Sequence, residues 1–83
     1  MRVSILNLHC LNALSDDRED LSSIVSDVRR STHSDVTIEE VASCLNDLVT
    51  ENMAARSTDA AGVEWFELTT KGRQELNANW VDD

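Results

Sequence analysis

The segment from Thr37 to Asn52 carries the clearest helix signal in the chain, and it limits the folds that the other residues can complete. Thr37 has the side chain of a helix N-cap, and Glu40 follows at the spacing of a capping box. Val36 precedes the cap, where an apolar side chain packs against Val41 in the next turn. We expect the helix to stop at Asn52, because asparagine tolerates the left-handed conformation of a C-terminal cap.

This helix should bury one face and leave the other in solvent. Apolar residues recur at the spacing that defines a buried stripe, namely Ile38, Val41, Leu45, Leu48 and Val49. The opposite face is polar and partly acidic, with Glu39, Ser43, Asn46, Asp47 and Thr50.

Two further helices are predicted before it. The first covers Val3 to Ser15 and gathers its inward face from Val3, Leu6, Cys10, Ala13 and Leu14. The second should begin after Asp16 or Asp17, since Asp16 and Glu19 have the spacing of a capping pair. Its apolar set follows the i, i+3, i+4, i+7 pattern: Leu21, Ile24, Val25 and Val28.

A hairpin and a last helix are predicted after residue 52. Met53 to Ser57 and Val63 to Leu68 have strand character, and Asp59 to Gly62 has turn chemistry. Phe66 and Leu68 share one face of the return strand and should point to the core. The last helix should start at Thr69 or Thr70 and run to about Trp80, with Leu76 and Trp80 facing inward and with Gly72 placed for close backbone packing.

Composition limits the kind of protein that this chain can be. Eighty-three residues are enough for one domain, which we expect to span residues 1–83. Seven basic and sixteen acidic residues give a formal net charge of −9, which repels both nucleic-acid phosphates and anionic membranes. No segment has the length and apolar character of a membrane span or the pattern of a signal peptide. The two cysteines match no disulfide framework, so we expect a cytoplasmic protein with buried thiols.

No catalytic or metal-binding constellation is evident. His9 and Cys10 are adjacent and point apart on a helix, while His33 and Cys44 belong to other segments. The paired acids fit helix starts, solvated faces and tails, and no glycine-rich phosphate loop is present. We therefore expect no metal, no cofactor and no enzymatic activity.

The predicted order helix, helix, helix, strand, strand, helix resembles the winged helix-turn-helix superfamily, and two motifs are similar to its PadR and MarR branches. The third helix contains Leu45-Asn46-Asp47-Leu48, followed by Asn52-Met53. After the hairpin, or wing, comes Phe66-Glu67-Leu68-Thr69-Thr70-Lys71-Gly72-Arg73. The resemblance implies a mostly α fold with a small two-stranded antiparallel wing. It also implies a transcriptional regulator that dimerises through additional helices and places the third helix in the major groove.

Two features depart from the pattern of these families. The third helix has no Lys or Arg with which to contact phosphates or read bases. The last helix ends near residue 80, so we expect no long dimerisation helix after it. The sequence therefore favours a non-catalytic module that binds a protein partner, with a dimeric DNA-binding regulator of the PadR or MarR type as the alternative.

Candidate site residues follow from these two hypotheses. Protein binding would use the acidic helix face or the outer face of the wing: Glu39, Glu40, Ser43, Asp47, Val63 and Trp65. DNA binding would use Arg29, Arg30, Ser43, Asn46, Arg56, Lys71 and Arg73.

Several of these side chains also have a purely structural interpretation, which the sequence leaves open. Arg29 and Arg30 suit the negative end of a helix dipole, and Trp65 could pack against the last or the first helix. Ile5 and Leu8 either pack under a neighbouring element or contribute to a homodimer, for which the wing is the other candidate surface.

Overall fold

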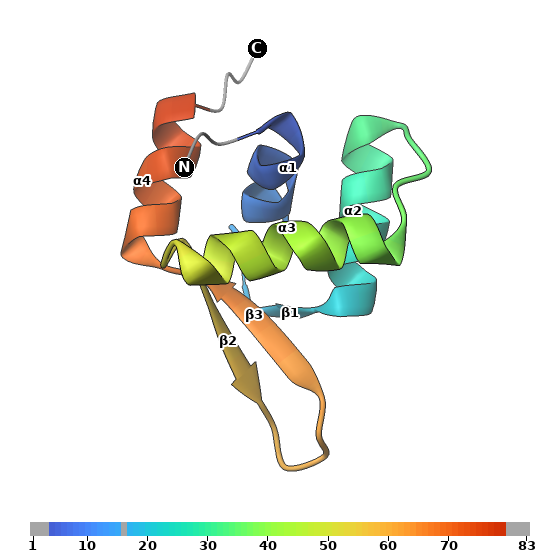
Figure 1. The fold of residues 1–83 in the computed structure, drawn as a ribbon, viewed down its shortest axis with the longest axis vertical. Helices are drawn as coiled ribbons and strands as arrows, with labels where there is room; N and C mark the ends of the chain where they lie inside the picture. Colours follow the sequence, from blue (N-terminus) through green and yellow to red (C-terminus); the bar gives the residue numbers. More distant parts are fainter. Residues whose placement is uncertain (1–3, 16, 80–83) are drawn as a thin grey trace.

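The computed structural model describes residues 4–15 and 17–79, which form four helices and a three-stranded antiparallel sheet (Figure 1). In chain order the elements are α1 (Ile5–Ala13), β1 (Glu19–Asp20), α2 (Leu21–Thr32), α3 (Ile38–Thr50), β2 (Ala54–Thr58), β3 (Glu64–Leu68) and α4 (Thr70–Asn79). The predicted order of helices and wing strands is confirmed, and β1 is an addition to it. The predicted roles of Val3, Asp16 and Trp80 fall on residues outside the described ranges.

The boundaries of α3 are set by the local signals that the sequence contains. The Thr37 hydroxyl accepts the N–H of Glu40 at 3.1 Å, and the Glu40 carboxylate accepts the N–H of Thr37 at 3.3 Å. At the other end Asn52 has a φ of 63°. The N–H groups of Asn52 and Met53 donate to the carbonyls of Val49 and Leu48, which is the Schellman pattern of a helix C-terminus. Both predicted ends of this helix are confirmed.

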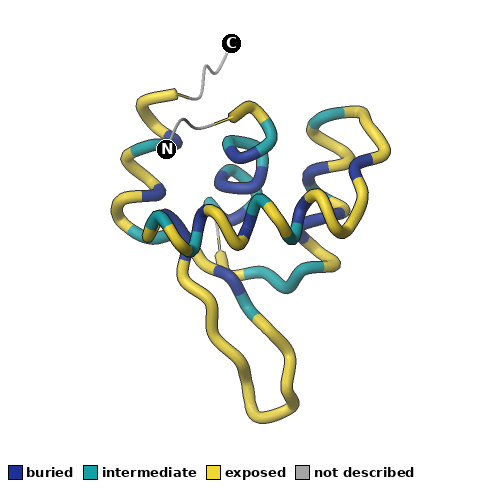
Figure 2. Tube along the Cα trace, viewed as in Figure 1, coloured by how far each residue is buried: buried dark blue, intermediate teal, exposed yellow. Residues whose placement is uncertain are grey.

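The core lies between the helices and the base of the hairpin (Figure 2). Its buried apolar residues are Cys10, Leu11, Leu14, Ile24, Val25, Val28, Val36, Val41, Leu45, Leu48, Met53, Ala54, Phe66 and Leu76. The hairpin leaves this core and projects past the helices, and most of its residues are exposed (Figures 1 and 2).

One prediction about the core was wrong, and two buried residues were missed. Ile38 is 52% exposed, because it is the first residue of α3 and precedes the part of the helix that enters the core. Leu11 and Asn7 are buried although neither belonged to the predicted face of the first helix. The reason is that α1 packs against α2, α3 and α4 together, so that its buried face is wider than a single stripe.

The start of α2 also differs from the prediction. The helix begins at Leu21, and its N-cap is Asp20, whose carboxylate accepts the N–H of Ser23 at 3.0 Å. Glu19 and Asp20 form β1, which pairs antiparallel with Phe66 and Trp65 of β3. Pairing with the open edge of β3 thus holds Glu19 and Asp20 in an extended conformation, although the capping pattern had assigned them to a helix.

The segment from the wing to α4 is held by a close backbone contact. Thr69 Oγ1 accepts the N–H of Gly72 at 3.0 Å and donates to the carbonyl of Asn52 at 2.6 Å. A Cβ atom added to Gly72 would lie 1.9 Å from the carbonyl oxygen of Met53. The predicted cap and the predicted close packing of Gly72 are both confirmed. Among the described residues, no helix is long and apolar enough to cross a bilayer.

Candidate functional site

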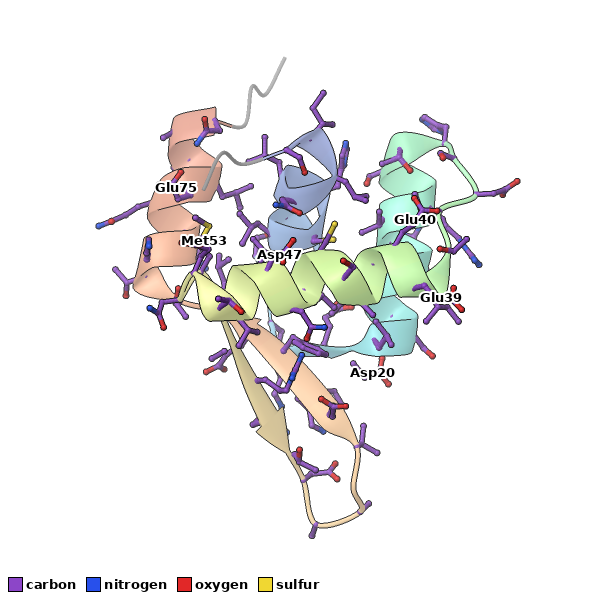
Figure 3. The ribbon with its side chains drawn as sticks, viewed as in Figure 1. Asp20, Glu39, Glu40, Asp47, Met53 and Glu75 are labelled. Atoms are coloured by element: carbon purple, nitrogen blue, oxygen red, sulfur yellow. The ribbon has the colours of Figure 1, made fainter. Side chains whose placement is uncertain are left out.

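The exposed face of α3 is mainly polar, and it carries the carboxylates of Glu39, Glu40 and Asp47 (Figure 3). Glu39, Glu40, Ser43, Asn46 and Asp47 are all exposed, as the amphipathic pattern predicted. Glu40 takes part in the capping box, whereas Glu39 and Asp47 do not contribute to a helix cap. This face therefore concentrates negative charge beside two neutral hydrogen-bonding side chains.

Arg56 joins this face to the wing. Its guanidinium donates to the amide oxygen of Asn46, and its Nε lies 3.2 Å from a carboxylate oxygen of Glu64 on the neighbouring strand. The same guanidinium lies 5.3 Å from the centre of the Phe66 ring. These groups border a cleft of about 280 Å³, lined by Leu21, Ala42, Asn46, Arg56, Glu64 and Phe66. Arg56 is thus the cation that the fold places next to the exposed face of α3.

Trp65 is half-buried, and its contacts come from the wing and from the loop before β1. Its Nε1 donates to the carboxylate of Asp59 at 2.9 Å, and the guanidinium of Arg18 lies 4.8 Å from the ring centre. The indole N–H and the backbone N–H of Val63 hold the pKa of Asp59 below its usual range. Val63 is 38% exposed. Arg18 and Asp59 were missed at the sequence level, because neither lies next to Trp65 in the chain.

The remaining cations proposed for DNA binding each have an intramolecular contact. Arg29 donates to the carbonyl of Val36 at 2.8 Å, and Arg30 pairs with Asp27 at 3.3 Å. Lys71 donates to the carbonyl of Glu51 at 2.9 Å, and Arg73 donates to that of Ser15 at 3.0 Å. Arg29 and Arg30 lie in the last turn of α2, as the dipole interpretation predicted. A hydrogen bond to a carbonyl leaves the positive charge in place, so Arg29, Lys71 and Arg73 still contribute to the field outside the protein.

The two residues considered for a dimer contact differ in environment. Leu8 is half-buried and packs against the core, which confirms the packing interpretation for this side chain. Ile5 is 76% exposed at the start of α1. A homodimer contact through Ile5 stays a prediction.

One acidic residue has an environment that the sequence did not suggest. Glu19 in β1 has a carboxylate oxygen that is shielded from solvent and has no hydrogen-bond partner among the described residues. Burial and the nearby carboxylate of Asp27 raise the pKa of Glu19 above its usual range. This arrangement costs stability at neutral pH.

The helices, the hairpin and the capped α4 together define a winged helix-turn-helix fold. Solved structures with this fold include Bacillus subtilis PadR in complex with operator DNA, which has a TM-score of 0.84 and 18% identity over 99% of this chain and 50% of that chain. BldR, a transcriptional regulator from Sulfolobus solfataricus, has a TM-score of 0.77 and 24% identity over 94% of this chain and 53% of its own. A MarR-family regulator from Silicibacter pomeroyi has a TM-score of 0.82 and 19% identity over 94% of this chain and 50% of its own.

These comparisons confirm the resemblance to PadR and MarR proteins at the level of the fold. The chain spans about half the length of these three proteins. The sequence matches no family model and no curated protein sequence.

Proposed function

We propose that the chain is the DNA-binding domain of a transcriptional regulator, with α3 directed at the major groove and the wing beside it. The observation that carries this proposal is the match of 99% of the chain to a PadR protein solved on operator DNA. This replaces the protein-binding module as the first hypothesis, because the structural neighbours are regulators and not protein-binding adaptors. The proposal treats residues 1–83 as one winged-helix domain.

The chemistry of the site supplies a small set of contacts to DNA. Ser43 and Asn46 are exposed on α3, and their hydroxyl and amide groups can hydrogen-bond to base edges or phosphate oxygens. Arg56 lies against Asn46 and adds a positive charge where the wing meets α3. Because Glu64 pairs with Arg56, part of that charge is neutralised within the wing itself.

The negative charge of the domain sets the conditions under which binding should be observed. A carboxylate about 7 Å from a phosphate is repelled by about 0.6 kcal/mol in water. The Debye length falls from about 10 Å at 0.1 M salt to about 3 Å at 1 M, which removes most of this repulsion. The attraction of the few cations weakens over the same range. We therefore expect a salt dependence much shallower than that of a basic DNA-binding domain, with measurable binding retained at about 1 M salt.

The test is a titration of fluorescent mixed-sequence duplex DNA with the purified chain between about 0.05 M and about 1 M salt, with the solution mass recorded in parallel. Asp47→Asn removes one charge from the face of α3 and should tighten binding about threefold at the lowest salt. Glu75→Gln removes one charge from α4 and serves as the matched control, with a smaller expected change. The two variants should bind alike at the highest salt. Failure of the wild-type chain to bind duplex DNA at any salt refutes the proposal.

A second candidate function rests on the same acidic face. Glu39 and Asp47 are exposed on α3, which has no basic residue between Ile38 and Thr50. The negative charge of this face repels phosphates and would attract a basic protein surface. On this hypothesis Asp47→Asn weakens partner binding instead of tightening DNA binding. The sign of the effect of this one variant therefore separates the two candidates.

A further inference from the structure

Arg56 holds the side chain of Asn46 in one orientation. The guanidinium of Arg56 on β2 donates from Nη2 to the amide oxygen Oδ1 of Asn46 on α3. An arginine side chain has hydrogen-bond donors and no acceptor, so the oxygen of the amide is the end that faces it. Among the described residues, the amide nitrogen of Asn46 has no hydrogen-bond partner. Because Asn46 is exposed, this nitrogen can donate to a ligand outside the protein.

Contacts within the wing fix the position of Arg56 itself. Its Nε lies 3.2 Å from Oε2 of Glu64, and its guanidinium lies 5.3 Å from the centre of the Phe66 ring. Glu64 and Phe66 belong to β3, and Phe66 is the residue that pairs with Arg56 across the two strands. The guanidinium is thus attached to a paired strand, and 39% of the Arg56 side chain remains exposed. Its other N–H groups can therefore also reach a ligand.

We propose that Arg56 is a positioning residue that makes Asn46 a hydrogen-bond donor only, so that this pair recognises guanine in the major groove and disfavours adenine. This role of Arg56 rests on the proposed function, in which α3 faces the major groove. The edge of guanine there offers two acceptors, N7 and O6, whereas adenine offers the acceptor N7 beside the amino group N6. The nitrogen of Asn46 and the outer N–H groups of Arg56 match the two acceptors of guanine.

Adenine is the base that asparagine usually binds, and the contact with Arg56 opposes that pairing. Asparagine binds adenine through both ends of its amide, since the nitrogen donates to N7 and the oxygen accepts from N6. In this chain the oxygen already accepts from Arg56. An adenine amino group that approached the same oxygen would also meet the guanidinium, which is positively charged and cannot accept a hydrogen bond. Cytosine presents an amino group as well, and thymine presents one acceptor, so guanine fits best.

Glu64 allows base preference to be separated from general affinity. Its carboxylate neutralises part of the charge of Arg56, so the contribution of this arginine to the attraction of phosphates is reduced. The direction of the hydrogen bond between Arg56 and Asn46 does not depend on that carboxylate. Glu64→Gln should therefore tighten binding to all duplexes alike and leave the base preference unchanged.

The test is a selection from a pool of random-sequence duplex DNA by the full chain, followed by sequencing of the bound fraction. The same selection with Asn46→Ala identifies the base pair that Asn46 contacts, because the preference at that position is lost. The wild-type chain should prefer guanine over adenine there by about tenfold, measured as the ratio of dissociation constants for two duplexes that differ only in this base pair.

Arg56→Met tests the positioning role directly. It removes the guanidinium, keeps an apolar side chain against Phe66 and frees the oxygen of Asn46. The preference at the same position should change from guanine to adenine, which loss of a purely structural contact would not cause. Arg56→Lys retains a positive charge and a donor-only side chain, so it should keep guanine. Asn46 and Arg56 are exposed, so we expect these variants to fold, and circular dichroism checks this.

The possible results separate this role from the proposed function. Adenine at the Asn46-dependent position in the wild type, or no position that depends on Asn46, overturns the recognition of guanine while DNA binding stands. A guanine preference that persists in Arg56→Met, or that disappears without a gain for adenine, overturns the role of Arg56. Recovery of no duplex by the wild-type chain overturns the proposed function, and the recognition of guanine fails with it.

Discussion

Gly72→Ala places a methyl group against the backbone, and its effect on stability can be worked out from the structure. The added Cβ would lie 1.9 Å from the carbonyl oxygen of Met53 and 2.9 Å from Cδ1 of Leu68. The Leu68 side chain can rotate away. The Met53 oxygen cannot move freely, because it accepts the N–H of Thr69 at 3.2 Å in the turn that joins the wing to α4. The substitution therefore forces α4 and the base of the wing apart.

The size of the effect comes from opposing contributions. Alanine in a helix is favoured over glycine by about 1 kcal/mol. Overpacking a close contact costs about 1 to 3 kcal/mol, and loss of the Thr69–Met53 hydrogen bond adds about 1 kcal/mol. We expect Gly72→Ala to lower the free energy of unfolding by about 1 to 3 kcal/mol.

Urea denaturation followed by tryptophan fluorescence measures this change. Gly62→Ala is the matched control, since a methyl group at Gly62 meets nothing within 4 Å but Gly62 has a φ of +85°. The control should lose about 1 to 2 kcal/mol through backbone strain alone. A Gly72→Ala protein as stable as the wild type, or more stable, would show that helix propensity outweighs the contact with Met53 and would refute the reasoning.

Further predictions concern the core and two carboxylates. Leu45→Ala should cost about 2 to 5 kcal/mol in urea denaturation because Leu45 is fully buried, and Ile38→Ala should cost much less because Ile38 is 52% exposed; equal losses would contradict the assigned face of α3. Asp59→Asn should destabilise the protein at neutral pH, and its deficit should disappear as the pH falls through the lowered pKa of Asp59, below the usual range for aspartate. Glu19→Gln should have the opposite effect on the free energy of unfolding at neutral pH. Because the folded-state pKa of Glu19 is raised, wild-type stability falls as the pH rises from the usual glutamate value through the folded one, so the variant should be more stable at neutral pH and equal in acid. Thermal unfolding across pH 2.5 to 8 checks both carboxylates, and parallel curves for variant and wild type would contradict either prediction.

Features that depend on neighbouring residues were predictable from the sequence. The two ends of α3 follow from Thr37 with Glu40 and from Asn52, because caps are formed by residues a few positions apart. The close packing of Gly72 and the inward direction of Phe66 also follow from local patterns. The fold class could be predicted because these signals occur in the order of a winged helix.

Features that depend on contacts between distant segments were not predictable. Several aspartates precede α2, and pairing of Glu19 with Phe66 selects Asp20 as the cap over the earlier ones. For the same reason the contact between Arg56 and Asn46 emerged only from the structure.

The charge on α3 is the property that the fold does not explain. Glu40 is needed for the capping box, whereas Glu39 and Asp47 are exposed and could be neutral without loss of the helix. Side chains that the fold leaves free are those through which function is expressed, since one fold supports many functions. On the proposed function, an acidic face beside Asn46 and Arg56 should weaken DNA binding at low salt and make it less sensitive to added salt, because screening weakens repulsion and attraction together. If Asp47→Asn tightens DNA binding at low salt and has no effect at high salt, the acidic face adjusts a DNA-binding surface. If it weakens binding to a basic protein, the same face is the binding surface.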